Sequence, residues 1–89
     1  MAACSSPEQR AQQHLESGIE LLEQGDKIKA SLEFRSALQL KEDLPDAWYG
    51  LSQIEEANQN WQAVAATLKR TLELDPKRID ALTRYARLM

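Results

Sequence analysis

Few side chains in this 89-residue sequence could carry out chemistry. His14 is the only histidine, so it is the only imidazole that could act as a general base. Cys4 is the only cysteine, which excludes an intrachain disulfide and a zinc site built from cysteines. A metal site would have to consist almost entirely of carboxylates, and we predict none. We therefore interpret His14 as a packing or rim residue of a helix.

Two adjacent acidic pairs, Glu42-Asp43 and Glu55-Glu56, are the remaining candidates for acid–base chemistry. Neighbouring residues on a helix point about 100° apart, so the members of a pair do not face one site. The three glycines are isolated from one another, so there is no glycine-rich phosphate loop. These observations predict neither an enzyme nor a cofactor. A small hydrolase or hydrolase subunit that uses acidic residues remains a distant alternative.

The charge of the chain is unevenly distributed. Residues 1–60 carry a net charge of −6 and residues 61–89 a net charge of +3, which gives −3 overall. An acidic chain argues against nucleic acid as a partner, and the basic pairs Lys69-Arg70 and Lys77-Arg78 are interpreted as solvated helix faces. The asymmetry favours head-to-tail contact between copies, through the association rate more than the affinity.

Helices are predicted to position these side chains. Ser6 can cap a helix, Pro7 suits the first helical position and Gln9 completes a capping box. No segment alternates with a period of two, so we predict no strand. We expect helices at residues 7–24, 27–41, 46–57, 61–74 and 79–89, separated by turns at Gly25-Asp26, Asp43-Leu44-Pro45, Asn58-Gln59-Asn60 and Asp75-Pro76.

The sequence also repeats itself. Asp46-Ala47-Trp48 returns 34 positions later as Asp80-Ala81-Leu82, and Phe34 returns as Leu68. A fixed period of this length indicates a stacked helical repeat, in which neighbouring helix pairs bury one another's apolar faces. We predict that the core includes Phe34, Leu38, Trp48, Leu51, Leu68 and Leu72.

On these residues the chain resembles the tetratricopeptide repeat family. The matching positions are Gly18, Leu21, Gly25, Ala30, Phe34, Ala37 and Leu38, then Trp48, Leu51, Ser52, Val64, Leu68, Thr71 and Pro76, then Leu82, Tyr85 and Ala86. The resemblance implies an all-α fold of helical hairpins, stacked as a short right-handed superhelix of about two and a half repeats. It divides the chain into a flexible lead and helix start (1–10), repeat 1 (11–44), repeat 2 (45–78) and the first helix of a third repeat or a capping helix (79–89).

The resemblance further implies function through a protein or peptide partner, because the first helix of each unit lines a concave face. The residues expected in this groove are Leu15, Ile19, Leu22, Tyr49, Gln53, Glu56, Thr83 and Arg87. Some family members grip the terminal carboxylate of a peptide with Lys, Asn and Arg, but Leu15 and Ile19 stand at the first-unit clamp positions here, which disfavours that mode. The apolar strip of Leu15, Ile19 and Leu22 fits either a partner groove or self-association.

The last helix points to assembly. Leu82, Tyr85, Ala86 and Met89 fall on one face of residues 79–89, and a repeat array needs a polar cap for solubility. We therefore expect a homodimer or helix-swapped dimer at high concentration, with this helix in the interface.

The first six residues carry a second resemblance. Met1-Ala2-Ala3-Cys4-Ser5-Ser6 is similar to the end of a bacterial lipoprotein signal, which implies lipidation of Cys4 and a parent protein on the periplasmic side of the bacterial envelope. The alternatives are a free thiol on a tail and a cytoplasmic protein. No apolar stretch approaches the roughly 18 residues of a membrane span, so a membrane would be reached only through this lipid anchor.

Overall fold

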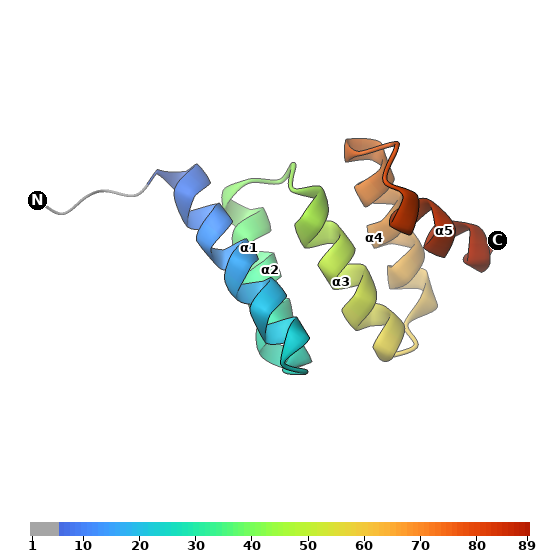
Figure 1. The fold of residues 1–89 in the computed structure, drawn as a ribbon, viewed down its shortest axis with the longest axis horizontal. Helices are drawn as coiled ribbons and strands as arrows, with labels where there is room; N and C mark the ends of the chain where they lie inside the picture. Colours follow the sequence, from blue (N-terminus) through green and yellow to red (C-terminus); the bar gives the residue numbers. More distant parts are fainter. Residues whose placement is uncertain (1–5) are drawn as a thin grey trace, which may run out of the picture.

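The computed structural model describes residues 6–89, and every regular element in that range is an α-helix. The helices are α1 (Pro7–Glu23), α2 (Lys27–Leu40), α3 (Pro45–Ala57), α4 (Trp61–Leu74) and α5 (Ile79–Leu88). The all-α prediction is confirmed, and the helix ends agree closely with those expected. In Figure 1, α1, α3 and α5 face the viewer, with α2 and α4 behind them.

The expected signals set the start and end of α1. The Ser6 hydroxyl accepts the Gln9 amide hydrogen at 3.1 Å, and the Gln9 side chain accepts the Ser6 amide hydrogen at 2.9 Å, which completes the capping box. Gly25 follows α1 with a φ of +88°, a conformation that glycine adopts at no steric cost. The Asp26 carboxylate then accepts the Lys29 amide hydrogen at 3.1 Å and caps α2.

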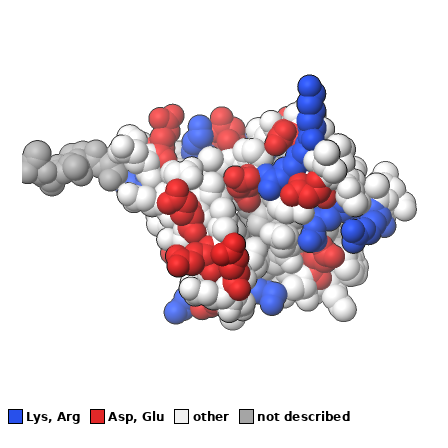
Figure 2. Space-filling model, viewed as in Figure 1, with Lys and Arg blue, Asp and Glu red and all other residues white. Residues whose placement is uncertain are grey.

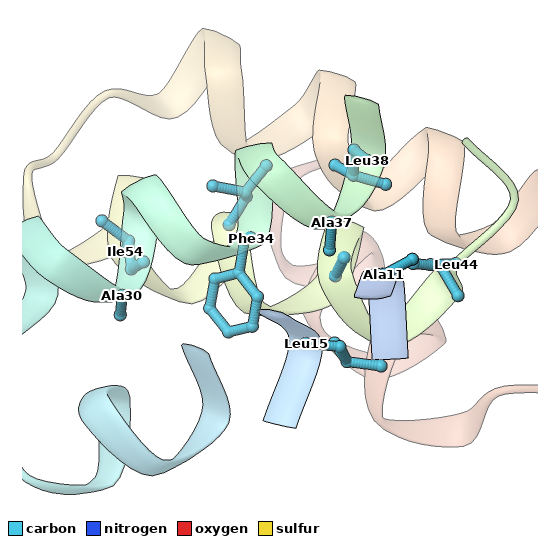
Figure 3. Close-up of a cluster of buried hydrophobic side chains, with 10 residues drawn as sticks. Ala11, Leu15, Ala30, Phe34, Ala37, Leu38, Leu44 and Ile54 are labelled. Carbon is cyan, nitrogen blue, oxygen red and sulfur yellow. The ribbon is translucent and has the colours of Figure 1, made fainter. Parts of the chain in front are cut away.

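Two clusters of buried side chains form the core. The first joins α1, α2 and α3 through Ala11, Leu15, Ala30, Phe34, Ala37, Leu38, Leu44, Ala47, Leu51 and Ile54 (Figure 3). The second joins α3, α4 and α5 through Tyr49, Val64, Leu68 and Ala81. Each cluster draws on a helix hairpin and the helix that follows it, so no hairpin buries its apolar face alone.

The predicted core is right at four of six positions. Phe34, Leu38, Leu51 and Leu68 are buried, whereas Trp48 and Leu72 are only partly buried and pack at the margins of the clusters. The Trp48 indole N–H donates to the carbonyl oxygen of Glu42 at 2.9 Å, outside α3. This polar end needs a partner, and the partner lies at the surface, so the ring stays partly exposed.

Phe34 is the most completely buried large side chain in the first cluster. Its ring is fully buried and lies between Gly18 on α1 and Gly50 on α3. A Cβ atom on Gly18 would lie 2.7 Å from Cε1 of Phe34, and one on Gly50 would lie closer still to the ring. The two glycines therefore make the slot that lets three helices converge on one aromatic ring.

Candidate functional site

The face made by α1, α3 and α5, hereafter the α1/α3/α5 face, is hollowed between α1 and α3. This groove encloses about 490 Å³ and is lined by Ile19, Leu22, Glu23, Phe34, Asp46, Tyr49, Gly50, Gln53 and Arg78. Ile19 is 38% exposed and Leu22 is half-buried, so an apolar surface remains open to a ligand. The structure thus brings together four of the residues predicted to line a groove: Ile19, Leu22, Tyr49 and Gln53.

Two arginines contact Tyr49 on this face. The guanidinium carbons of Arg78 and Arg84 lie 4.5 and 5.5 Å from the centre of the Tyr49 ring. Nε of Arg84 also donates to the Tyr49 hydroxyl at 2.8 Å, and its Nη1 forms an ion pair with Glu56. These contacts fix the orientation of the ring and join α5 to α3.

Arg78 joins the α4–α5 turn to the start of α3. Its Nη1 lies 2.5 Å from an Asp46 carboxylate oxygen, and its Nε donates to Asp80 at 3.0 Å. Partial burial lowers the pKa of Arg78, but the hydrogen bonds and charges of Asp46 and Asp80 outweigh it, so the pKa is raised above the ordinary value. Arg78 therefore keeps its positive charge, and the rim of the groove keeps its charge pattern.

A second hollow continues this face between α3, α4 and α5. It encloses about 420 Å³ and is lined by Glu56, Trp61, Val64, Arg84, Arg87 and Leu88. Two of the predicted groove residues, Glu56 and Arg87, lie here rather than in the first hollow. A third, Thr83, lines neither hollow, and its hydroxyl donates to the carbonyl oxygen of Ile79 in its own helix at 2.9 Å.

Leu15 was predicted to lie in the open apolar strip of the groove, but the structure buries it. It is only 4% exposed and belongs to the first core cluster, together with Leu44 and Ala47 from the α2–α3 connection and α3 (Figure 3). The helical period places residue 15 on the same face as Ile19, but packing in the cluster formed with α2 and α3 covers it. Leu15 therefore stabilises the fold, and the open apolar surface on α1 consists of Ile19 and Leu22.

The apolar face predicted on α5 is divided in the structure. Tyr85 and Leu88 pack with Ala81 against the second core cluster. Leu82 and Met89 point away from it, with 45% and 88% of their surface exposed. Of the four side chains predicted on this face, Leu82, Ala86 and Met89 are therefore open to another molecule, and Tyr85 is not.

The two arginines on Tyr49 were not predicted as site residues. Arg78 was interpreted as part of a solvated helix face, yet only 21% of its side chain is exposed. The sequence did contain a sign that Arg84 makes a special contact. It stands 34 positions after Gly50, so a long cationic side chain replaces a glycine at the equivalent position of the repeat. That break in the pattern marks a contact made between units.

The charges separate across the molecule as they do along the sequence. Acidic side chains gather over α1, and basic side chains gather over α5 and the turn before it (Figure 2). Glu16, Glu20 and Glu23 of α1 are exposed, and so is Arg87 of α5. A ligand that crosses the α1/α3/α5 face therefore meets opposite charges at its two ends.

The other candidates for chemistry have structural roles or lie outside the described residues. Nδ1 of His14 lies 2.6 Å from a carboxylate oxygen of Glu33, which ties α1 to α2. Residues 6–89 contain no group of three or more His, Cys, Asp and Glu side chains that could hold a metal ion. Within the same range, no helix is long and apolar enough to cross a membrane. Cys4, the proposed lipidation site, lies outside the described residues.

Comparison with known proteins identifies the repeat. Residues 45–88, which span α3, α4 and α5, match the tetratricopeptide repeat family. The chain is 36% identical over 72 residues to the peroxisomal targeting signal receptor of Candida albicans and 38% identical over 72 residues to that of Pichia angusta. The aligned segment covers 80% of this chain but only 12% and 13% of those relatives, so the chain spans about an eighth of their length.

These relatives correct the predicted location. They are fungal receptors named for a peroxisomal targeting signal, and the interpretation as a bacterial envelope lipoprotein is wrong. That interpretation depended on a few small residues before a single cysteine, a pattern too short to be specific.

Proposed function

From the tetratricopeptide repeat that residues 45–88 form, we propose that this chain binds a peptide segment of another protein on the α1/α3/α5 face. In this proposal residues 11–44 form one repeat, residues 45–78 a second, and residues 79–89 the first helix of a third. The relatives are named as receptors for a targeting signal, so we propose a targeting-signal peptide as the ligand class.

The observation that carries this proposal is the groove between α1 and α3. Ile19 and Leu22 offer an apolar surface for one side chain of the ligand, and the amide of Gln53 can both donate to and accept from its backbone. Tyr49 is only 9% exposed, and Arg78 and Arg84 hold its ring in place, so it forms a fixed part of the groove floor. A preformed site of this kind reduces the ordering cost of binding.

The separated charges favour one direction for the bound peptide. The acidic side chains of α1, with Glu23 on the rim of the groove, would attract basic residues of the ligand. Arg87 at the other end would attract acidic residues. Such complementarity contributes to specificity and to the rate of association, and its effect decreases as salt increases.

Self-association through α5 is the second candidate, because Leu82 and Met89 are exposed beside a basic surface and α1 carries the opposite charge. In this case a second copy would occupy the face. Sedimentation equilibrium separates the two: a monomer that binds peptide supports the first proposal, and a dimer whose formation the peptide prevents supports the second.

Replacing Ile19 with Asp tests the first proposal. The side chain is partly exposed, so Ile19→Asp should leave the helices intact and weaken binding of a peptide that carries a peroxisomal targeting signal by about tenfold or more, since an apolar contact becomes a buried charge. Titration calorimetry measures the affinity, and circular dichroism checks the fold.

Ile28→Asp is the matched control for this test. It makes the same chemical change on α2, at a side chain that is 80% exposed and lies outside the groove between α1 and α3. The affinity for the targeting-signal peptide should not change. Equal losses in the two variants, or no loss in either, would contradict the placement of the ligand on the α1/α3/α5 face.

A further inference from the structure

We propose that a second groove, between α2 and α4 on the side away from the α1/α3/α5 face, binds a peptide segment that combines acidic and apolar side chains. This α2/α4 groove encloses about 830 Å³ and is lined by Arg35, Leu38, Gln39, Glu42, Trp48, Leu51 and Arg70. The groove shares no lining residue with the hollows of the α1/α3/α5 face described above. A protein that uses both faces could hold two partner segments at once.

The apolar part of the groove is centred on Trp48. Leu38 and Leu51 line the same groove and are almost fully buried, at 9% and 7% exposure, so they form its fixed floor. The Trp48 indole N–H is already bonded to the carbonyl oxygen of Glu42 and Arg70 lies over the ring, so a ligand would contact the part of the ring that Arg70 leaves open. An aromatic face above a floor of leucines suits an apolar side chain such as Leu or Phe.

The cationic part of the groove consists of Arg35 and Arg70. Arg35 is exposed and makes no ion pair or hydrogen bond with a residue that the structure describes. Arg70 lies 5.9 Å from the centre of the Trp48 ring, and its one ion pair, to Glu73 at 3.3 Å, is between exposed groups and weak. Both guanidiniums are therefore available to a carboxylate, which they can bind through two hydrogen bonds.

The charged side chains that line this groove are mostly positive, whereas most of the chain is acidic. Two arginines and one carboxylate, Glu42, line it, whereas residues 1–60 carry a net charge of −6. An acidic segment that approaches the molecule is repelled by α1 and attracted here. The sign of the local charge is the reason to expect an acidic ligand rather than a basic one.

Exposed apolar side chains extend this surface along α2. Ile28 and Leu32 are 80% and 59% exposed, and they line a neighbouring hollow that shares Arg35 with the α2/α4 groove. These two side chains lie one helical turn apart, so they offer the ligand a second apolar contact on the far side of Arg35 from Trp48. The expected ligand therefore carries acidic residues flanked by apolar ones.

Fluorescence of Trp48 provides a direct test. Trp61→Phe, at a half-exposed position outside the groove, leaves Trp48 as the only tryptophan. This variant is titrated with three short synthetic peptides that share the same Leu and Phe positions and differ only in carrying Glu, Lys or Ser at the others. The Glu peptide should shift the Trp48 emission and bind about tenfold more tightly than the other two.

Charge reversal on the protein completes the test. Arg35→Glu should weaken binding of the Glu peptide by about tenfold, whereas Lys69→Glu, the same change at an exposed position of α4 outside the groove, should change it little. Ile19→Asp should leave this binding intact, which separates the α2/α4 groove from the α1/α3/α5 face. Circular dichroism checks that each variant is folded.

Three results would overturn the proposal. The first is equal binding of the Glu and Lys peptides, and the second is an Arg35→Glu variant that binds the Glu peptide as the parent does. The third is a Trp48 emission that changes with protein concentration in the absence of peptide, which would mean that a second copy of the chain occupies the groove.

Discussion

Phe34→Ala should destabilise the protein by about 3–5 kcal/mol, because it removes a fully buried ring on which three helices converge. Gly18 and Gly50 line the slot, and neither has a side chain that could fill the space left behind. A loss of this size is a large share of the roughly 5–15 kcal/mol that holds a small domain together. The variant should therefore unfold at a clearly lower urea concentration than the parent.

Urea unfolding followed by circular dichroism measures this loss. Leu32→Ala is the matched control, since it truncates an apolar side chain of the same helix that is 59% exposed, and it should cost no more than about 0.5 kcal/mol. If both variants unfold at the same urea concentration as the parent, Phe34 does not hold the hairpins together and the described packing is wrong.

Gly50→Ala should cost about 1–3 kcal/mol although it adds a single methyl group and replaces glycine by a better helix former. The new Cβ would overlap the Phe34 ring, which is fully buried among α1, α2 and α3 and can give way only by shifting those helices or the groove that it helps to line. Steric overlap therefore outweighs the gain in helix propensity, which is about 1 kcal/mol.

A double-mutant cycle with Phe34→Leu isolates this overlap. Leucine is smaller than phenylalanine, so Gly50→Ala should cost clearly less in the Phe34→Leu background than in the parent, with a coupling free energy of about 0.5–3 kcal/mol. The four proteins are compared by thermal and urea unfolding. Independent effects of the two substitutions would contradict the close approach of Phe34 to Gly50.

The fold could be predicted because its signals are local. The capping box at Ser6, the glycine after α1 and Pro76 each act within a few residues, so the sequence locates the turns before any packing is known. The repeat adds the tertiary arrangement, because a helix hairpin that returns after 34 residues must stack on its neighbour. The repeat pattern predicts Trp48 in the core, but the structure leaves its side chain partly exposed. The reason is that the indole N–H donates to the carbonyl oxygen of Glu42, which lies between α2 and α3.

The binding face was harder to predict because it depends on contacts between units. Leu15 and Ile19 lie one helical turn apart on α1, yet Leu15 is buried in the core cluster formed with α2 and α3, whereas Ile19 stays exposed. Arg84 reaches back from α5 to Tyr49 and Glu56, a contact between residues far apart in the sequence. The bacterial lipoprotein interpretation failed for a different reason, namely that a short motif was given a specific meaning.

The most direct test of the account is a backbone-amide NMR titration of the chain with a peptide that carries a peroxisomal targeting signal. We predict that the resonances that shift belong to the groove between α1 and α3, including those of Ile19, Leu22, Gly50 and Gln53, while those of Arg35 and Gln39 on α2 stay unchanged. No shifts at millimolar peptide, or shifts confined to α2 and α4, would contradict the central claim that the α1/α3/α5 face is the peptide-binding surface.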